Sequence, residues 1–486
     1  GMPSPPRPEP AAPQPGLASR QDLGDRQRSA QRRLLRILPR LRKAGFALRE
    51  LGRRLRRAPH RVELFHQVDD PYSHLALQAV GPLLERHAIE IRFHLVGRTD
   101  ALHEPEPELL TAYARRDCAW VAPHYGLSFP QDAGRPDAGD IRRVERLLAG
   151  RIRDDSFLEL ALGAGSALWR ADRHALDRLT QEAALASDEA TRETLREGNA
   201  LRARRRHYSG AMFWYAGDWY WGVDRLHHLE RRLGRLGAAR HGASAPRFDR
   251  PPLDPGPRRN DGRLELEMFP SLRSPYTAAI FDRSLAIADA VGVPVRLRPV
   301  MPMVMRGVPA PATKGLYIWL DARREALHAG LPYGDMYDPI GRAVTRGFSL
   351  WPWAREAGRE RAYLSAFLRA AFVEGRPTGS DEGLRWVVEQ AGLDWDEART
   401  HLDRDDPSEE LEANRRLLYD ELGLWGVPSY RLRGPAGEPD LCVWGQDRLW
   451  LVCAEIARRL ALPTAAGPER GRAPDQAPGS YQIGEV

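Results

Sequence analysis

Three short segments carry residues that could bind and activate a thiol. They are Arg273-Ser274-Pro275-Tyr276-Thr277, Gly426-Val427-Pro428-Ser429-Tyr430 and Trp444-Gly445-Gln446-Asp447-Arg448-Leu449. Serine followed by proline is typical of a helix start, with serine as the N-cap and proline at the first helical position. Unpaired amides and the positive end of the helix dipole gather there, which lowers the pKa of a nearby thiol. Ser274 could therefore donate a hydrogen bond to a thiolate that a ligand supplies, or it could serve only as a helix cap.

The second segment predicts a cis peptide bond before Pro428. An X-Pro bond is the only peptide bond that adopts cis at low cost. In this segment a small residue, Val427 and Pro428 precede an aromatic strand. A cis bond there would leave the Val427 backbone free to pair with an extended peptide. Gly-x-Pro also occurs in ordinary loops, so the order of all three segments carries the prediction.

The order of these segments resembles thioredoxin-like proteins of the DsbA and kappa glutathione-transferase type, and most closely 2-hydroxychromene-2-carboxylate isomerase. The resemblance implies that glutathione is the cofactor and that Ser274, in the position of the SPY motif's serine, is catalytic. It also implies that Val427, beside cis-Pro428, holds the cysteinyl part of glutathione. Gln446 and Asp447 would receive its γ-glutamyl end, although Asp447 is equally suited to cap the last helix. The expected substrate is a conjugated aromatic acid.

Lysine is rare in this chain. Of the 73 basic residues, only Lys43 and Lys314 are lysines, and a lysine kept among so many arginines can indicate a need for its compact ammonium. The resemblance implies that Lys314 helps to bind glutathione, although two lysines could also survive by chance. Upstream, Met301, Met303 and Met305 could line an adaptable apolar pocket or fill the core.

The cysteines exclude dithiol chemistry. Cys118, Cys442 and Cys453 form no CxxC pair and no metal-ligand spacing. Dithiol exchange requires two thiols within reach of each other. We therefore expect buried, inert cysteines and no bound metal.

The positive charge lies near the N-terminus. Between Arg26 and Arg57 there are thirteen basic residues and one acid, a net charge of +12, so the remainder of the chain carries about −5 of the total +7. Leucines recur among these arginines at helical spacing, which predicts a basic amphipathic helix over residues 29–58. Such a helix could bind an anionic membrane surface, nucleic acid or an acidic partner, or it could pack its leucines on the protein's own body.

The chain repeats itself, which predicts two similar domains. A strand over residues 61–65 leads into Asp70-Pro71-Tyr72, and one over 263–269 leads into Ser274-Pro275-Tyr276. Each is followed by a helix and a second strand, an order that favours parallel pairing. The resemblance then implies an α/β fold with two tandem thioredoxin-like (DsbA-type) domains, each with a helical insertion. The predicted boundaries are a disordered tail (1–28), the basic helix (29–58), a degenerate thioredoxin-like domain (59–237), a linker (238–261), the domain that resembles the isomerase (262–463) and a second disordered tail (464–486).

The first domain is expected not to bind and activate a thiol. Asp70 stands where Ser274 stands, and an ionised carboxylate there would repel a thiolate. Met212 stands where the cis proline should be, and a cis bond before a residue other than proline costs about 2.5 to 4 kcal/mol. We therefore expect a structural, dimer-like or regulatory role for this domain.

Other sequence features set the function class. A chain of 486 residues predicts two or three domains, and it has neither an apolar run of membrane-spanning length nor an export segment near its start. We expect a cytoplasmic protein whose oligomeric state the sequence does not indicate. The expected function is that of a glutathione-dependent isomerase or transferase acting on a conjugated aromatic acid. The alternative is a non-catalytic DsbA-like binding or scaffold protein.

Overall fold

The computed structural model describes residues 24–243, 245–308 and 310–464, and the predicted tails lie almost wholly outside these ranges. Each half of the chain contains one four-stranded mixed sheet, with orders β2-β1-β3-β4 and β6-β5-β7-β8. The strands of the first sheet are β1 (His60–Gln67), β2 (Ile89–Val96), β3 (Met212–Tyr215) and β4 (Asp218–Trp221). Those of the second are β5 (Glu265–Phe269), β6 (Val295–Leu297), β7 (Ser429–Arg433) and β8 (Leu441–Trp444). The predicted fold class is confirmed.

The two sheets share strand directions as well as order. β1 pairs in parallel with β2, and β5 with β6, while the other pairs are antiparallel. In each sheet the parallel pair is joined by one helix, α3 (Pro71–Arg86) or α10 (Pro275–Val291). The predicted parallel pairing is therefore correct in both halves. A tight hairpin joins antiparallel strands, whereas a helix that crosses over the sheet allows the second strand to run parallel to the first.

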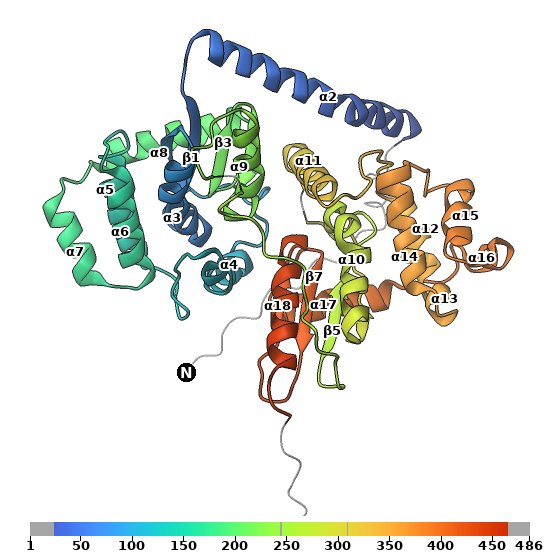
Figure 1. The fold of residues 1–486 in the computed structure, drawn as a ribbon. Coiled ribbons are helices and arrows are strands. Elements are labelled where there is room, and N and C mark those ends of the chain that lie inside the picture. The colour runs from blue at the N-terminus through green and yellow to red at the C-terminus, as the bar shows by residue number, and fades with distance from the viewer. Residues whose placement is uncertain (1–23, 244, 309, 465–486) are drawn as a thin grey trace, which may run out of the picture.

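Helical insertions separate the two βα parts of each unit (Figure 1). In the first unit they are α4 (Pro107–Val121), η1 (Ala122–Tyr125), α5 (Ala138–Ala149), α6 (Phe157–Trp169), α7 (Arg173–Glu182) and α8 (Asp188–Arg204), and η2 (Val223–Arg225) and α9 (Leu226–Arg235) end the unit. In the second unit they are η3 (Met303–Arg306), α11 (Ala312–His328), α12 (Arg342–Ser349), α13 (Trp351–Glu356), α14 (Glu360–Arg369), η4 (Ala370–Glu374), α15 (Asp381–Gln390), α16 (Trp395–His401) and α17 (Ser408–Asp420), followed at the end of the chain by η5 (Gln446–Arg448) and α18 (Leu449–Leu460). The chain turns between α6 and α7 at Ala171, whose φ of 54° is left-handed.

The basic helix is α2 (Asp25–Leu55), and it lies across both units (Figure 1). Its N-terminal part binds the second unit, where Arg32 pairs with Asp335 at 2.6 Å. Its middle binds the first unit, where Arg42 pairs with Asp218 at 2.6 Å. Only part of its apolar surface packs on the body, since Leu35 is buried while Leu34 is 56% exposed.

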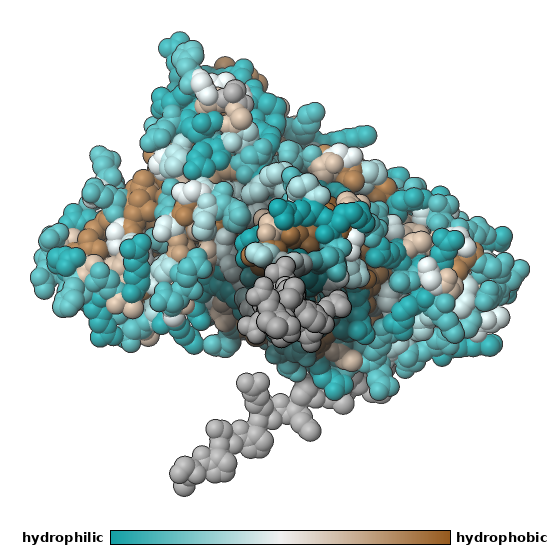
Figure 2. Space-filling model, turned by 60° about the horizontal axis from the view of Figure 1, so that its bottom comes forward, coloured by the Kyte–Doolittle hydropathy of each residue, from teal (hydrophilic) through white to brown (hydrophobic). Residues whose placement is uncertain are grey.

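The face of the molecule in Figure 2 is mostly hydrophilic, and its hydrophobic residues lie in separate patches. Among the described residues, no helix combines the length and the apolar character that crossing a bilayer demands.

Candidate functional site

Ser274 caps α10 in the way its sequence predicts. Its side chain accepts a hydrogen bond from the Thr277 amide at 3.1 Å, and Pro275 occupies the first helical turn. The Ser274 hydroxyl can donate only weakly to the Val427 carbonyl, because these oxygens are 3.5 Å apart, the outer limit of a hydrogen bond. The hydroxyl proton is thus loosely held and able to turn toward another acceptor.

The contact between Ser274 and Val427 joins segments 153 residues apart. The Val427–Pro428 bond is cis, as predicted. Pro428 is buried, and its carbonyl accepts a hydrogen bond from the Gly445 amide at 2.8 Å, which fixes the loop against the start of η5. The Val427 amide has no hydrogen-bond partner among the residues that the structure describes. The three segments singled out in the sequence therefore meet at one place.

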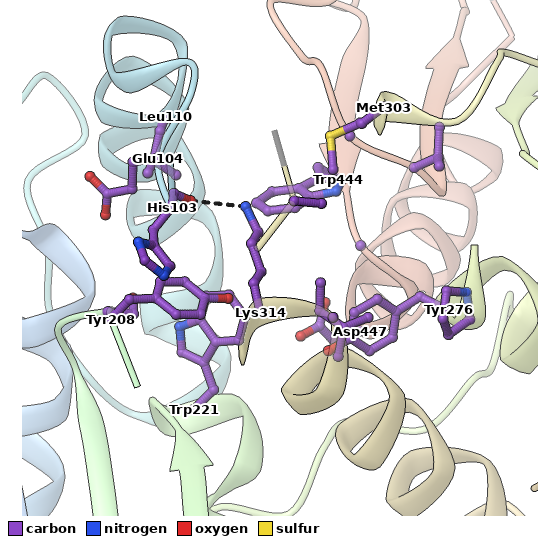
Figure 3. Close-up of a pocket in the computed structure, with 18 of the residues that line it drawn as sticks. His103, Glu104, Leu110, Tyr208, Trp221, Tyr276, Met303, Lys314, Trp444 and Asp447 are labelled. Carbon is purple, nitrogen blue, oxygen red and sulfur yellow. Dashed lines mark hydrogen bonds between the residues drawn. The ribbon is translucent and has the colours of Figure 1, made fainter. Parts of the chain in front are cut away.

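This place is one wall of a cavity of about 640 Å³ between the two units. Figure 3 shows side chains of the first unit, such as Glu104 and Tyr208, on one side and Met303 and Trp444 of the second unit on the other. Gln31, Leu34 and Leu35 of α2 also line it. A volume of this size is within the range of small-molecule sites in proteins.

Gln446 and Asp447 line the same cavity, but both have partners within the protein. The side-chain amide of Gln446 donates to Glu325 at 3.0 Å, and Arg225 of the first unit donates to Asp447 at 2.8 Å. Burial alone would raise the pKa of Asp447, but the charges of Arg225 and Arg448 outweigh it and hold that pKa below its ordinary value. Asp447 is therefore anionic, and its role toward a ligand ammonium stays a prediction.

Lys314 lies in the first turn of α11. Its ammonium donates to the His103 carbonyl at 2.9 Å and lies 5.8 Å from the centre of the Tyr208 ring (Figure 3). Burial lowers its pKa, while the nearby Glu104 opposes this effect. Lys314, a residue of the second unit, thus places its ammonium at the cavity, where it is hydrogen-bonded to the first unit.

The corresponding loop of the first unit corrects one sequence prediction. The Gly222 amide donates to the Ala211 carbonyl at 2.9 Å, as the Gly445 amide donates to that of Pro428. Ala211, and not Met212, therefore occupies the place of the cis proline. Met212 already pairs within β3, one position further along the strand. The error was a one-residue shift, which sequence alone could not resolve because neither residue is a proline.

Asp70 caps α3 as predicted, accepting from the Tyr72 amide at 3.1 Å, and it lines the same cavity as Ser274. No feature of the sequence indicated that the two caps share one cavity. Burial raises the pKa of Asp70 to about 7, although a hydrogen bond from the Ser73 hydroxyl opposes this. At neutral pH a large share of the Asp70 carboxyl is consequently protonated, so it repels an anion less than the sequence implied.

Asp70→Asn is expected to stabilise the protein by about 1 to 2 kcal/mol at pH 8 and to change little at pH 4. Because the pKa of Asp70 is higher in the folded than in the unfolded chain, the wild type loses stability as the pH rises from about 4 to 7. Asparagine cannot ionise, so this part of the loss disappears. Urea unfolding at several pH values measures the difference, and parallel curves for the two proteins would contradict the prediction.

Two crossed sets of ion pairs hold the units together around the cavity. In the first unit, Tyr72 donates to Asp117 at 2.7 Å, and Asp117 also accepts from Arg448 of the second unit at 2.8 Å. In the second unit, Tyr276 donates to Asp321 at 2.6 Å, and Asp321 also accepts from Arg225 of the first unit at 2.9 Å. Arg448 also donates to Asp224 of the first unit at 2.9 Å, and Arg225 also donates to Asp447 of the second unit at 2.8 Å. Corresponding residues of the two units thus exchange partners, as in a two-fold interface.

Comparisons with known proteins agree with this geometry in the second unit. Residues 265–457 match the family model described as DSBA-like thioredoxin domain. The second unit is a DSBA-like thioredoxin domain. The comparison with curated protein sequences gave no match.

Solved structures similar to the chain include three enzymes. A probable DsbA oxidoreductase from Streptomyces coelicolor shares 24% identity with a TM-score of 0.33, over 44% of this chain and 100% of the other. 2-Hydroxychromene-2-carboxylate isomerase shares 19% identity with a TM-score of 0.34, over 40% and 94%. The cytosolic disulfide reductase DsbM from Pseudomonas aeruginosa shares 22% identity with a TM-score of 0.32, over 40% and 100%.

The DSBA-like domain has no thiol at the head of α10, where Ser274 stands. Its cysteines lie elsewhere: Cys453 is buried in α18 and Cys442 is half-buried in β8, and no disulfide joins them. Burial raises the pKa of Cys442 to about 11 and that of Cys453 to about 12. These thiols are therefore protonated at neutral pH and poor nucleophiles.

Proposed function

We propose that the DSBA-like domain binds glutathione and uses it as an isomerase or transferase of the 2-hydroxychromene-2-carboxylate isomerase and kappa type. The observation that supports this most is the position of Ser274. Its hydroxyl stands at the head of α10, beside the Val427 backbone and on the wall of a cavity, where the protein supplies no thiol of its own. A site built in this way suits a thiol that arrives with a ligand.

The residues present fit a γ-glutamyl tripeptide thiol. The Val427 amide, which has no partner among the described residues, could bind the backbone of the cysteinyl part. Asp447 could attract the ammonium of the γ-glutamyl end, with Gln446 beside it, and Lys314 could attract a carboxylate. These roles are part of the proposal.

When bound, glutathione would supply a thiolate for reversible addition to a conjugated aromatic acid, or for conjugation. Ser274 would donate its hydroxyl proton in a hydrogen bond to the sulfur and so favour the thiolate over the thiol. The positive end of α10 would act in the same direction. Ser274 keeps its own proton throughout, because it stabilises the sulfur charge without taking part in proton transfer.

The cavity also offers an apolar region for the second substrate. Met303, Trp444 and Leu110 line the cavity and pack against one hydrophobic cluster, and Ser274 and Lys314 line the same cavity. Of the three methionines singled out in the sequence, Met303 lines the cavity, while Met301 and Met305 pack against the core. An aromatic acid could thus place its ring on this wall.

Titration of the full chain with reduced glutathione by calorimetry tests the proposal. We expect saturable binding by the wild type, and at least tenfold weaker binding by Ser274→Ala at pH 7, because a charge-assisted hydrogen bond is worth about 1.5 to 3 kcal/mol. Ser380→Ala is the matched control, since Ser380 caps α15 in the same way, by accepting from the Gly383 amide at 3.2 Å, but does not line the cavity. Failure of the wild type to bind would reject the enzyme proposal.

A non-catalytic binding protein is the second candidate. The observation in its favour is that Asp447 and Lys314 already bind the first unit, through Arg225 and His103. If glutathione binds equally well to the wild type and to Ser274→Ala, the cavity is a carrier site and Ser274 is only a helix cap.

A further inference from the structure

Helix α2 carries an outward stripe of apolar residues that the fold leaves uncovered. It consists of Leu34, Ile37, Leu41, Ala44, Leu48, Leu51 and Leu55. All are exposed, and the six large side chains are between 52% and 78% exposed. They account for six of the eight exposed large hydrophobic residues in the described part of the chain. An uncovered apolar surface of this extent is typical of an interaction site.

The opposite side of α2 is the one that packs on the protein. Leu35 is buried in the core, and Phe46 lies under the guanidinium of Arg232, 4.3 Å from its ring centre. Arg32 and Arg42 form the ion pairs with the second and the first unit. The body therefore holds α2 in place without using the outward stripe.

The spacing of the stripe favours a helical partner over a flat surface. Its members are separated alternately by three and four residues, so the pattern repeats every seven residues over three repeats. A straight α-helix with such a pattern turns its apolar stripe by about 20° per repeat, or roughly 60° over the stripe. A membrane is flat and would lose contact with one end of the stripe, whereas a second helix can wind along it.

The charges beside the stripe indicate that the partner is acidic. Arginines at positions 33, 40 and 54 each directly precede a leucine of the stripe, where a coiled coil places its interhelical ion pairs. Over its length α2 has eleven basic residues and two acids, a net charge of +9. Two copies of α2 would bring these arginines against each other or against Gln31, Leu38, Gly45 and Gly52, which include no acid. A second copy is therefore a poor partner.

We propose that α2 docks an acidic amphipathic helix of another protein. The partner's apolar residues would pack along the outward stripe, and its carboxylates would pair with the flanking arginines. This proposal does not rest on the function proposed for the cavity.

A synthetic peptide of four heptads, with Leu at positions a and d and Glu at e and g, tests the docking site on the full chain. We expect the wild type to bind it at least tenfold more tightly than a matched peptide with Lys in place of Glu. Leu41→Gln/Leu48→Gln should weaken binding at least tenfold. Leu102→Gln/Leu327→Gln, which changes exposed leucines outside α2, should bind like the wild type. Arg33→Glu/Arg40→Glu should reverse the preference between the two peptides.

Four outcomes would overturn this proposal. The first is that the Glu peptide does not bind, and the second is that both leucine double variants lose the same affinity for it. The third is that anionic vesicles or duplex DNA retain the protein while the peptide does not bind. The fourth is that light scattering shows a dimer that Leu41→Gln/Leu48→Gln abolishes. The last two would assign the stripe to a membrane, to nucleic acid or to a second copy.

Discussion

Arg448→Met is expected to lower the free energy of unfolding by roughly 3 to 5 kcal/mol, because breaking a buried ion pair leaves its partner charge without compensation. Arg448 is 3% exposed and pairs with Asp117, which is 1% exposed, at 2.7 Å. Methionine fills a similar volume, so the loss reports the charge and not a cavity. Urea unfolding followed by circular dichroism at pH 7 measures it.

The control is Arg458→Met, whose side chain is 47% exposed and pairs with Glu438 and Glu455. Exposed pairs contribute about 1 kcal/mol or less. Adding Asp117→Asn to Arg448→Met should recover part of the stability, since it removes the uncompensated carboxylate. If Arg448→Met costs no more than the control, the crossed pairs do not hold the two units together.

Ser274→Cys is expected to create a thiol that iodoacetamide modifies at pH 7 at least a hundredfold faster than any native cysteine. A native thiol with a pKa of about 11, such as that of Cys442, is ionised in about one molecule in 10,000 at this pH. An ordinary thiol, with a pKa of about 8.5, is ionised in about 3 in 100, and a helix N-terminus lowers the pKa further. Mass spectrometry of the modified peptides at several times gives the ratio of rates.

This experiment examines the electrostatics of the site without any assumption about glutathione. A Ser380→Cys variant places a thiol at the head of α15, outside the cavity, and separates the general effect of a helix start from the effect of the site. Modification of the Ser274→Cys thiol at the slow rate of the native cysteines would show that the head of α10 does not attract an anion.

The sequence predicted the parts of the fold whose signals are local. The repeated order of a strand, a helix that begins with proline and a second strand predicted the parallel pairs of both sheets and the helices α3 and α10. Ser274 and Pro428 could be expected to meet because the resemblance supplied their order. The local chemistry of a helix cap and of an X-Pro bond is readable without coordinates.

The relation between the two units could not be read in this way. Nothing local marks Asp117, on α4 of the first helical insertion, as the partner of Arg448 331 residues away. The available signal was an arginine that follows an aspartate in each unit, as Arg225 follows Asp224 and Arg448 follows Asp447. A buried arginine requires a partner. The shared cavity follows from these long-range pairs, which no local signal in the first unit indicates.

Leu34 belongs both to the outward stripe of α2 and to the lining of the cavity. A molecule that covers this leucine from outside would therefore also touch the boundary of the interior space. If a helix docked on the stripe changes the affinity of the cavity for a small ligand, that ligand must change the affinity of the stripe for the helix by the same factor. Leu34 is the residue through which such a coupling would be transmitted.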